Sequence, residues 1–161
     1  MTEVNVMNEL VYRNLSEDAK RQICAWKYGG EYDLYNLPFY EEMQVRQIGF
    51  MNPQREKNYY GFWDESILVG FVNILEEKEE VFIGIGVNPD LCNKHYGQRM
   101  LLITYEISKK LYPDKPLYLE VRTWNIRAVK CYQKAGFRID GQAYELTTGI
   151  GTGTFYRMIR E

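Results

Sequence analysis

The sequence predicts a single domain, residues 1–161, with a mixed α/β fold. We expect a mostly antiparallel sheet of about six to seven strands with a central parallel pair, flanked by helices. Short turns join the strands before Val81, which makes them antiparallel, whereas a helix connects Val81–Val87 to Leu117–Val121. A crossover helix of that kind makes the two strands that it connects parallel.

The N-terminal part of the chain reads as one strand followed by two helices. Apolar residues place the strand at 10–15, and Ser16 is suited to cap a helix that Gly29-Gly30 ends. A second helix is predicted at 41–48, where Asn52-Pro53 closes the segment.

Three strands and a long helix follow. Tyr59–Trp63 and Ile67–Leu75 predict a hairpin around an acidic turn, and uncharged Val81–Val87 predicts a strand buried on both faces. Asn88-Pro89-Asp90 stops that strand, and apolar residues at helical spacing run from Gly97 to position 111.

The C-terminal part predicts a strand, a helix and two last strands. After the strand at 117–121, Thr123 or Asn125 caps a helix that Gly136 ends in a left-handed conformation. Strands are expected at 137–140 and 154–159. The glycine-rich run 149–153 between them predicts a flexible hairpin turn, because no helix follows it as in a phosphate loop.

Composition excludes several functional classes. The net charge of −2, with interspersed acidic and basic residues, argues against nucleic-acid binding. Without a signal peptide or a long apolar run, a cytoplasmic protein with no membrane contact is expected. The three cysteines form no CxxC pair, so neither a disulfide framework nor a metal site is expected. His95 is the only histidine, which leaves a Ser-His or Cys-His mechanism little support.

The stretch from Val81 to position 111 suggests a ligand. A helix that begins where a buried strand ends presents unpaired N–H groups and a positive dipole end, which favour an anion. Lys94 adds a positive charge in the loop, and Gly97 has no side chain to hold a phosphate away. A phosphate-bearing ligand is therefore the first hypothesis, against an ordinary crossover with a solvated lysine.

The segment 31–42 combines aromatic and acidic residues. Tyr32, Tyr35 and Tyr40, beside four carboxylates, would suit a pocket for a cationic amine. The alternative is that the aromatic rings belong to the core and the acids to the surface.

Two motifs resemble the GNAT superfamily of N-acetyltransferases. The strand, loop and helix at 83–102 resemble the family's acetyl-CoA motif, in which Arg or Gln, two residues, Gly, one residue, and Gly or Ala precede a helix. The segment 125–137, NIRAVKCYQKAGF, is similar to the family's NxxAxxxYxxxGF helix. Cys92 stands where Arg or Gln is usual, and His95 stands where the first Gly is usual.

The resemblance implies acetyl-CoA as the acyl donor and assigns residues to it. The strand end would offer backbone groups to the pantetheine arm and the thioester, the loop would cradle the diphosphate, and Asn125 would contact the cofactor arm. The implied cofactor-binding residues are Ile85, Gly86, Val87, Asn93, Lys94, His95, Tyr96, Gly97, Gln98 and Asn125. A side chain at position 95 could crowd the diphosphate if that residue needs positive φ.

The resemblance also implies a direct transfer of acetyl to an amine, with Tyr132 as the general acid for the departing thiolate. The base is open among Glu80, Glu145 and a water relay, because Val81 aligns with the family's usual carboxylate. We expect an acceptor that is a small-molecule amine or a peptide N-terminus, and self-association into a homodimer. The alternatives are a GNAT-like domain that binds an acyl-CoA or another ligand without turnover, and an interaction module that uses the 14 tyrosines.

Overall fold

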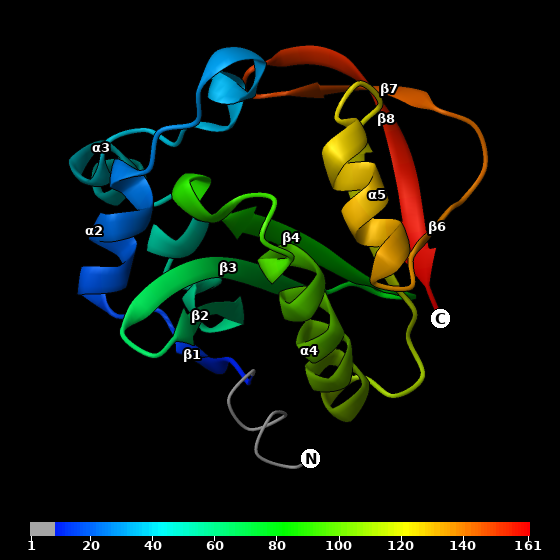
Figure 1. Ribbon diagram of the computed structural model, residues 1–161, viewed down its shortest axis with the longest axis horizontal. Helices are drawn as coiled ribbons and strands as arrows, with labels where there is room; N and C mark the ends of the chain where they lie inside the picture. The colour runs from blue at the N-terminus through cyan, green and yellow to red at the C-terminus, as the bar shows by residue number, and fades with distance from the viewer. Residues whose placement is uncertain (1–8) are drawn as a thin grey trace. The chain divides into compact units, whose positions relative to one another are not determined.

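The computed structural model describes residues 9–161 (Figure 1). The backbone divides into two compact units. Unit 1 contains residues 9–72 and Ile85–Tyr96, and unit 2 contains Asn73–Gly84 and Gly97–Glu161. Two strands, β3 and β4, contribute residues to both units. The expectation of a single domain stays a prediction.

Unit 1 holds the N-terminal strand and helices that the sequence predicts. Ser16 caps the first helix by accepting a hydrogen bond from the Ala19 backbone N–H at 3.1 Å. The elements are β1 (Val11–Asn14), α2 (Glu17–Ala25), α3 (Tyr40–Arg46), β2 (Tyr59–Asp64), the first part of β3 (Ile67–Glu76) and the end of β4 (Val81–Val87), with short 3₁₀ turns at Gly30–Tyr35, Gly49–Met51, Glu56–Asn58 and Pro89–Leu91.

Unit 2 holds the C-terminal elements. Its members are α4 (Tyr96–Leu111, from Gly97 on), β5 (Leu117–Arg122), α5 (Ile126–Lys134), β6 (Arg138–Ile139), β7 (Tyr144–Thr148) and β8 (Gly151–Arg160). Within the described chain, no helix is both long and apolar enough to cross a bilayer.

The strands form a mixed sheet, as the sequence predicts. Its hydrogen-bonded order is β1-β2-β3-β4-β5-β8-β6, with β7 paired to β8. The pair β4 and β5 is parallel, with Val81 opposite Leu117, whereas β5 and β8 are antiparallel. The predicted fold class is therefore confirmed, and the described sheet has eight strands.

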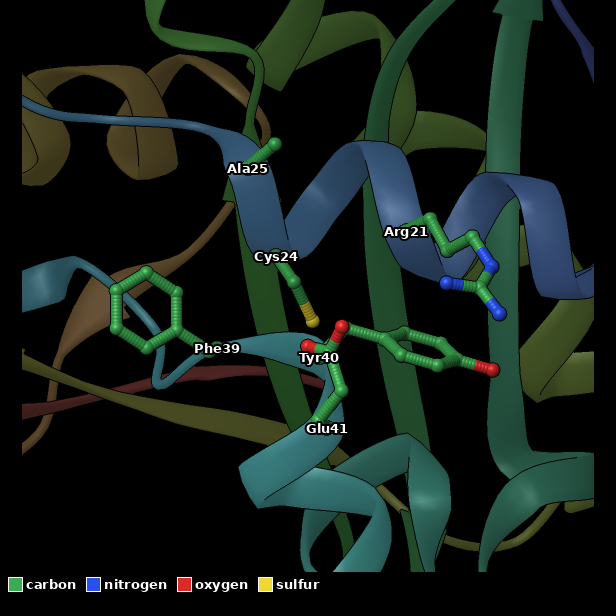
Figure 2. Close-up of a pocket in the computed structure, with 6 residues that line it drawn as sticks. All are labelled: Arg21, Cys24, Ala25, Phe39, Tyr40 and Glu41. Atoms are coloured by element: carbon green, nitrogen blue, oxygen red, sulfur yellow. The ribbon is translucent and has the colours of Figure 1, made fainter.

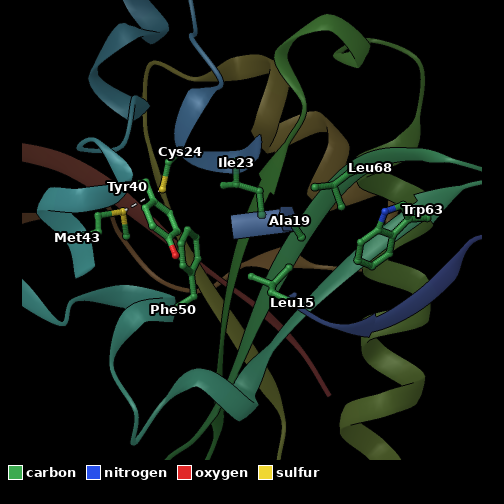
Figure 3. Close-up of a cluster of buried hydrophobic side chains, with 9 residues drawn as sticks. All are labelled: Leu15, Ala19, Ile23, Cys24, Tyr40, Met43, Phe50, Trp63 and Leu68. Carbon is green, nitrogen blue, oxygen red and sulfur yellow. Dashed lines mark hydrogen bonds between the residues drawn. The ribbon is translucent and has the colours of Figure 1, made fainter. Parts of the chain in front are cut away.

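The core of unit 1 lies between α2, α3 and the first strands (Figure 3). Phe50, Ile23 and Ala19 are fully buried there, and the Cys24 thiol contacts the Met43 sulfur at 3.6 Å. Lys20 is buried as well, and its ammonium pairs with Glu56 and with Glu17. Burial lowers the pKa of Lys20, but hydrogen bonds to these two carboxylates outweigh it and raise the pKa above its ordinary value.

In unit 2, alternate residues of β5 are buried. Leu117, Leu119 and Val121 point into the core, and Leu119 lies opposite the buried Met158 of β8. The intervening residues, among them Glu120 and Arg122, therefore share the other face of this strand.

Three sequence predictions need correction. The helix α2 ends at Ala25, because Trp26 is already extended, and Gly30 opens a 3₁₀ turn instead. The strand β4 is not buried on both faces, since only Val81 and Ile83 are buried and the residues between and after them are half-buried.

The third correction concerns the glycine-rich run. The sequence reading misses β7 altogether, and β8 begins at Gly151 rather than at residue 154. Thr148 pairs with Gly151, so only Gly149 and Ile150 form the turn of a β7–β8 hairpin. The sequence prediction of a hairpin turn is right in kind, but the turn is much shorter.

Candidate active site

The strand β4 ends in unit 1 with the segment Ile85–Val87. Its ladder with β5 comprises only Val81 and Phe82, so within unit 2 the next residues, Ile83 and Gly84, have no partner on β5. The strand therefore leaves its parallel neighbour after two pairs of residues, so backbone groups of its following residues are not used in a β4–β5 ladder.

Tyr28 and Phe71 fix the last residues of β4. The Tyr28 hydroxyl donates a hydrogen bond to the Val87 carbonyl at 2.6 Å. A Cβ at Gly86 would lie 2.4 Å from the ring of Phe71, so this position must remain glycine. Two of the three predicted strand residues thus have defined neighbours.

The loop after β4 is tied to unit 1 by side chains. Asn88 accepts a hydrogen bond from the Asp90 backbone N–H at 3.0 Å and donates to the Leu68 carbonyl at 3.2 Å. At the other end, the Tyr96 hydroxyl donates to Asp64 at 2.6 Å. The loop is held at both ends.

Between these ends, two residues have left-handed backbone. The φ angles are 69° at Asn93 and 65° at His95, and Lys94 between them is exposed. Left-handed residues alternating with others turn successive N–H groups toward a common point, which suits an anion. Positive φ at His95 is the condition under which its side chain was expected to crowd a diphosphate, and the residue has it.

These features fit a diphosphate. The loop leads directly into α4, which begins at Tyr96 and has Gly97 buried and Gln98 half-buried in its first turn. Unpaired N–H groups of a helix start, an exposed lysine and a turn of N–H groups are the donors that phosphate oxygens accept.

In unit 2, the helix α5 starts on the predicted cap. The Asn125 side chain, only 6% exposed, accepts a hydrogen bond from the Ala128 backbone N–H at 3.2 Å, which decides between Thr123 and Asn125. Gly136 follows the helix with φ of 96°, as predicted. Tyr132 lies half-buried on α5.

Glu80 precedes β4 and is held by Arg157 of β8. The Arg157 guanidinium donates to both carboxylate oxygens of Glu80, at 3.0 and 2.5 Å, and to Asp140 at 3.1 Å. Hydrogen bonds to Glu80 raise the pKa of Arg157.

Sequence reasoning missed a second carboxylate of unit 2, Glu120. It is exposed on β5, and its Oε2 accepts a hydrogen bond from the Tyr144 hydroxyl at 2.7 Å. Burial and this bond raise the pKa of Tyr144, so the phenol remains a proton donor. The signal in the sequence was a lone charge in the alternating strand Leu117–Val121.

A small cavity in unit 1 involves part of the predicted amine pocket (Figure 2). Its volume is about 230 Å³, and its lining comprises Arg21, Cys24, Ala25, Phe39, Tyr40 and Glu41. The Arg21 guanidinium lies 4.0 Å from the centre of the Tyr40 ring, and the Tyr40 hydroxyl donates to Glu17. A cation already occupies one face of this ring, which leaves less room for a cationic ligand.

Within residues 9–161, no group of three His, Cys, Asp or Glu side chains is arranged to hold a metal ion. Cys92 and Cys131 are half-buried, and Cys24 is buried. Burial raises the pKa of the Cys24 thiol, which keeps it protonated.

Comparison with known families supports the resemblance on which these assignments depend. The model of the acetyltransferase (GNAT) family matches residues 13–137, which include the loop and all of α5. The chain belongs to the GNAT family. Members of this family use acetyl-CoA as acetyl donor, so at the family level the chain is an acyl-CoA-dependent N-acetyltransferase.

Solved structures share this GNAT fold at low sequence identity. A GNAT acetyltransferase from Bacillus anthracis has a TM-score of 0.76 and 17% identity, with 94% of each chain covered. A spermidine N-acetyltransferase chimera that includes the Vibrio cholerae enzyme has a TM-score of 0.73 and 18% identity over 95% of both chains.

The enzyme AAC(6')-Ib in complex with ribostamycin and coenzyme A has a TM-score of 0.71 and 16% identity, with 95% of this chain and 93% of that chain covered. At such identities the likeness concerns the fold. No curated protein sequence matches this GNAT chain.

Proposed function

We propose that the chain transfers an acetyl group from acetyl-CoA directly to a primary amine of a small molecule or a peptide N-terminus. The observation that carries this proposal is the loop 93–96, in which two left-handed residues flank an exposed lysine at the start of α4. That arrangement suits the diphosphate of coenzyme A.

The cofactor would be held along the chain from β4 to α4. Ile85, Gly86 and Val87 would offer backbone groups to the pantetheine arm, and residues 93–98 would surround the diphosphate. Asn125 would contact the arm from the start of α5. When bound, acetyl-CoA supplies an acetyl group activated as a thioester.

Two groups of this chain would assist the transfer, one by stabilising the oxyanion and one by donating a proton. A backbone N–H of the β4 end would donate to the oxyanion that develops at the acetyl carbonyl. Tyr132 would donate a proton to the departing thiolate. Because the ordinary pKa of a phenol is about 10 and that of a thiol about 8.5, this transfer is slightly uphill and its gain is modest.

The amine must lose a proton. Glu145 and a water relay stay candidates for the base from the sequence, and the structure allows two further carboxylates of unit 2, Glu80 and Glu120, to be compared. Both carboxylate oxygens of Glu80 are hydrogen-bonded by the Arg157 guanidinium, whereas Glu120 accepts one hydrogen bond, from the neutral Tyr144 hydroxyl, on one oxygen. We therefore expect Glu120→Gln to lower turnover more than Glu80→Gln does. The measurement is the acetylation rate of both variants across pH, compared after unfolding experiments have shown that the two variants are equally stable. The reverse order would return the role to Glu80.

The acceptor class rests on the chemistry of the family. Two structural neighbours are a spermidine N-acetyltransferase chimera and AAC(6')-Ib in complex with ribostamycin, and spermidine and ribostamycin both carry primary amines. We propose the same functional group, a neutral primary amine, as nucleophile here. Cytoplasmic location and a homodimer stay predictions.

The proposal is tested by release of free coenzyme A from acetyl-CoA in the presence of polyamines, aminoglycosides, amino acids and short peptides. We expect release above the acceptor-free rate with at least one amine, and a product heavier by one acetyl group in mass spectrometry. A protein that binds acetyl-CoA but acetylates no member of these classes would contradict the proposed activity.

One observation favours a second candidate, a GNAT domain that binds an acyl-CoA without turnover. His95 adopts φ of 65° at a position where the family motif has glycine. A left-handed conformation costs an L-residue about 1 to 2 kcal/mol, which could weaken the diphosphate site. Coenzyme A release with any amine would decide against this candidate.

A further inference from the structure

Arg122, at the C-terminal end of β5, is a buried cation without a carboxylate partner. The residue is only 9% exposed, although arginine is rarely buried unless it is paired. Within residues 9–161 no acidic group lies within ion-pair distance of it. Among the described residues it donates one hydrogen bond, to the Thr148 hydroxyl at 3.5 Å, at the limit of such a bond.

None of the neighbouring carboxylates of unit 2 forms an ion pair with Arg122. Glu120, two residues earlier on the same face of β5, accepts from the neutral Tyr144 hydroxyl and is not within ion-pair distance of Arg122. Glu80 and Asp140 both bind Arg157. The positive charge of Arg122 is thus left with the ring of Phe155, whose centre lies 4.8 Å from the guanidinium carbon.

The β7–β8 hairpin is shaped around this guanidinium. In the register of the sheet, Arg122 lies opposite Phe155 of β8, and its side chain extends over Gly153 toward Thr148 of β7. A Cβ at Gly153 would lie 2.1 Å from Nη1 of Arg122. Figure 1 shows β7 and β8 as the long hairpin at the C-terminal end of the chain. A glycine in the hairpin therefore makes room for the arginine.

Burying a cation without a counter-ion is unfavourable, so the arrangement calls for an anion that completes it. We propose that Arg122, with the Thr148 hydroxyl, binds a carboxylate of the amine acceptor, so that this GNAT enzyme acetylates amines that also carry a carboxylate. This inference rests on the proposed function. A guanidinium presents two parallel N–H donors that match a carboxylate.

A carboxylate fits better than a phosphate. The site has one uncompensated cation, which balances one negative charge, and the next arginine of the unit, Arg157, already binds two carboxylates. The single positive charge of Arg122 would balance only one of the two negative charges of a phosphate dianion. The phosphates of coenzyme A have their own expected donors at Lys94 and the start of α4.

The first experiment is independent of turnover. Thermal unfolding is measured in sodium acetate and in sodium chloride at equal ionic strength, for the native chain, Arg122→Met and the control Arg138→Met, which removes an arginine that is 60% exposed. We expect acetate to raise the unfolding midpoint of the native chain and of the control over chloride, but not that of Arg122→Met. Arg122→Met in chloride should unfold at the same temperature or higher, because an unpaired buried charge is gone.

Two results together would overturn the proposal: unfolding midpoints of the native chain that are equal in acetate and chloride, and a lower midpoint for Arg122→Met. Arg122 would then contribute to stability through packing and would bind no anion. Gly153→Ala provides a second variant that keeps the charge and displaces the guanidinium. It should lose the acetate effect as Arg122→Met does, and an acetate effect that survives Gly153→Ala would also contradict the site.

The second experiment compares acceptors that differ only in the carboxylate: amino acids and dipeptides against their C-terminal amides. We expect kcat/KM for the carboxylate form to be about ten- to a hundredfold higher in the native chain, and the ratio to approach one in Arg122→Met. A preference for the amide, or a ratio unchanged in Arg122→Met, would overturn the assignment. A tenfold loss of coenzyme A affinity in Arg122→Met, measured by calorimetry, would also overturn the assignment. Arg122 would then bind an anionic group of the cofactor and not a carboxylate of the acceptor.

Failure of the proposed function is distinct from failure of this inference. A chain that acetylates no amine but still shows the acetate effect through Arg122 would refute the activity and leave the anion site. A chain that acetylates amines equally well with and without a carboxylate on the acceptor would support the proposed activity and refute the carboxylate site at Arg122.

Discussion

The two segments that carry the family motifs differ in which residue types occupy their positions of unusual backbone conformation. In α5, the cap position holds Asn125 and the positive φ of 96° falls on Gly136, so each position has a residue type that suits it. In the loop before α4, the φ of 65° falls on His95. The loop keeps the backbone of a glycine position with a different residue, so a motif can depart in sequence while its geometry remains.

The largest expected effect tests whether α5 takes part in chemistry as well as structure. Tyr132→Phe removes the proposed proton donor and should lower turnover by roughly ten- to ten-thousand-fold, with binding of acetyl-CoA nearly intact. Steady-state rates and calorimetric binding of acetyl-CoA provide the two measurements. Unchanged turnover would remove Tyr132 from the mechanism and leave α5 a structural role.

The next effect tests the cap. Asn125→Ala removes the acceptor for the Ala128 N–H and should lower the free energy of unfolding by about 0.5 to 2 kcal/mol. Asn125→Ser keeps a capping oxygen and serves as the control, with most of the stability retained in chemical denaturation. If both variants were equally destabilised, the buried amide rather than its capping bond would account for the loss.

The third effect tests the glycine after α5. Gly136→Ala places a side chain at positive φ and within 2.9 Å of the Arg160 Nε, so we expect a loss of about 1 to 2 kcal/mol. The control is Gly149→Ala, where a Cβ would meet nothing within 4 Å. Equal unfolding midpoints for the two variants would show that Gly136 is not constrained as described.

The smallest effect has the opposite sign and concerns the loop. His95→Gly relieves the left-handed histidine and should stabilise the chain by up to about 1 kcal/mol, less the entropy that glycine loses on folding. The affinity for acetyl-CoA should rise severalfold. Asn93→Gly is the control with a smaller gain, because asparagine tolerates this conformation better. A weaker affinity after His95→Gly would mean that the imidazole itself contacts the cofactor.

Local signals made most of the fold predictable from the sequence. Ser16 and Asn125 are good caps, Gly136 suits a left-handed position, and uncharged Val81–Val87 forms the central strand. The strand β7 was missed because Tyr144–Thr148 is a short, half-polar run whose pairing to β8 depends on the neighbouring strand.

The candidate site was predictable only where it is local. The loop residues 93–98 follow one another, so their spacing could be read directly. The partners of Glu80 and Arg122 could not, because Arg157 lies 77 positions beyond Glu80 and the hairpin that surrounds Arg122 depends on strand register. The burial of Lys20 escaped the sequence reading for the same reason, since Glu56 approaches it from a distant turn.

The most direct test of the central claim is thermal unfolding with and without saturating acetyl-CoA. Ligand at about a hundredfold over its Kd adds roughly 2.7 kcal/mol, which for a domain of this size raises the midpoint by roughly 5 to 10 °C. We expect a shift of that order despite His95, and a larger one in His95→Gly at a subsaturating concentration. An unchanged midpoint at millimolar acetyl-CoA would contradict the claim that this loop binds the cofactor.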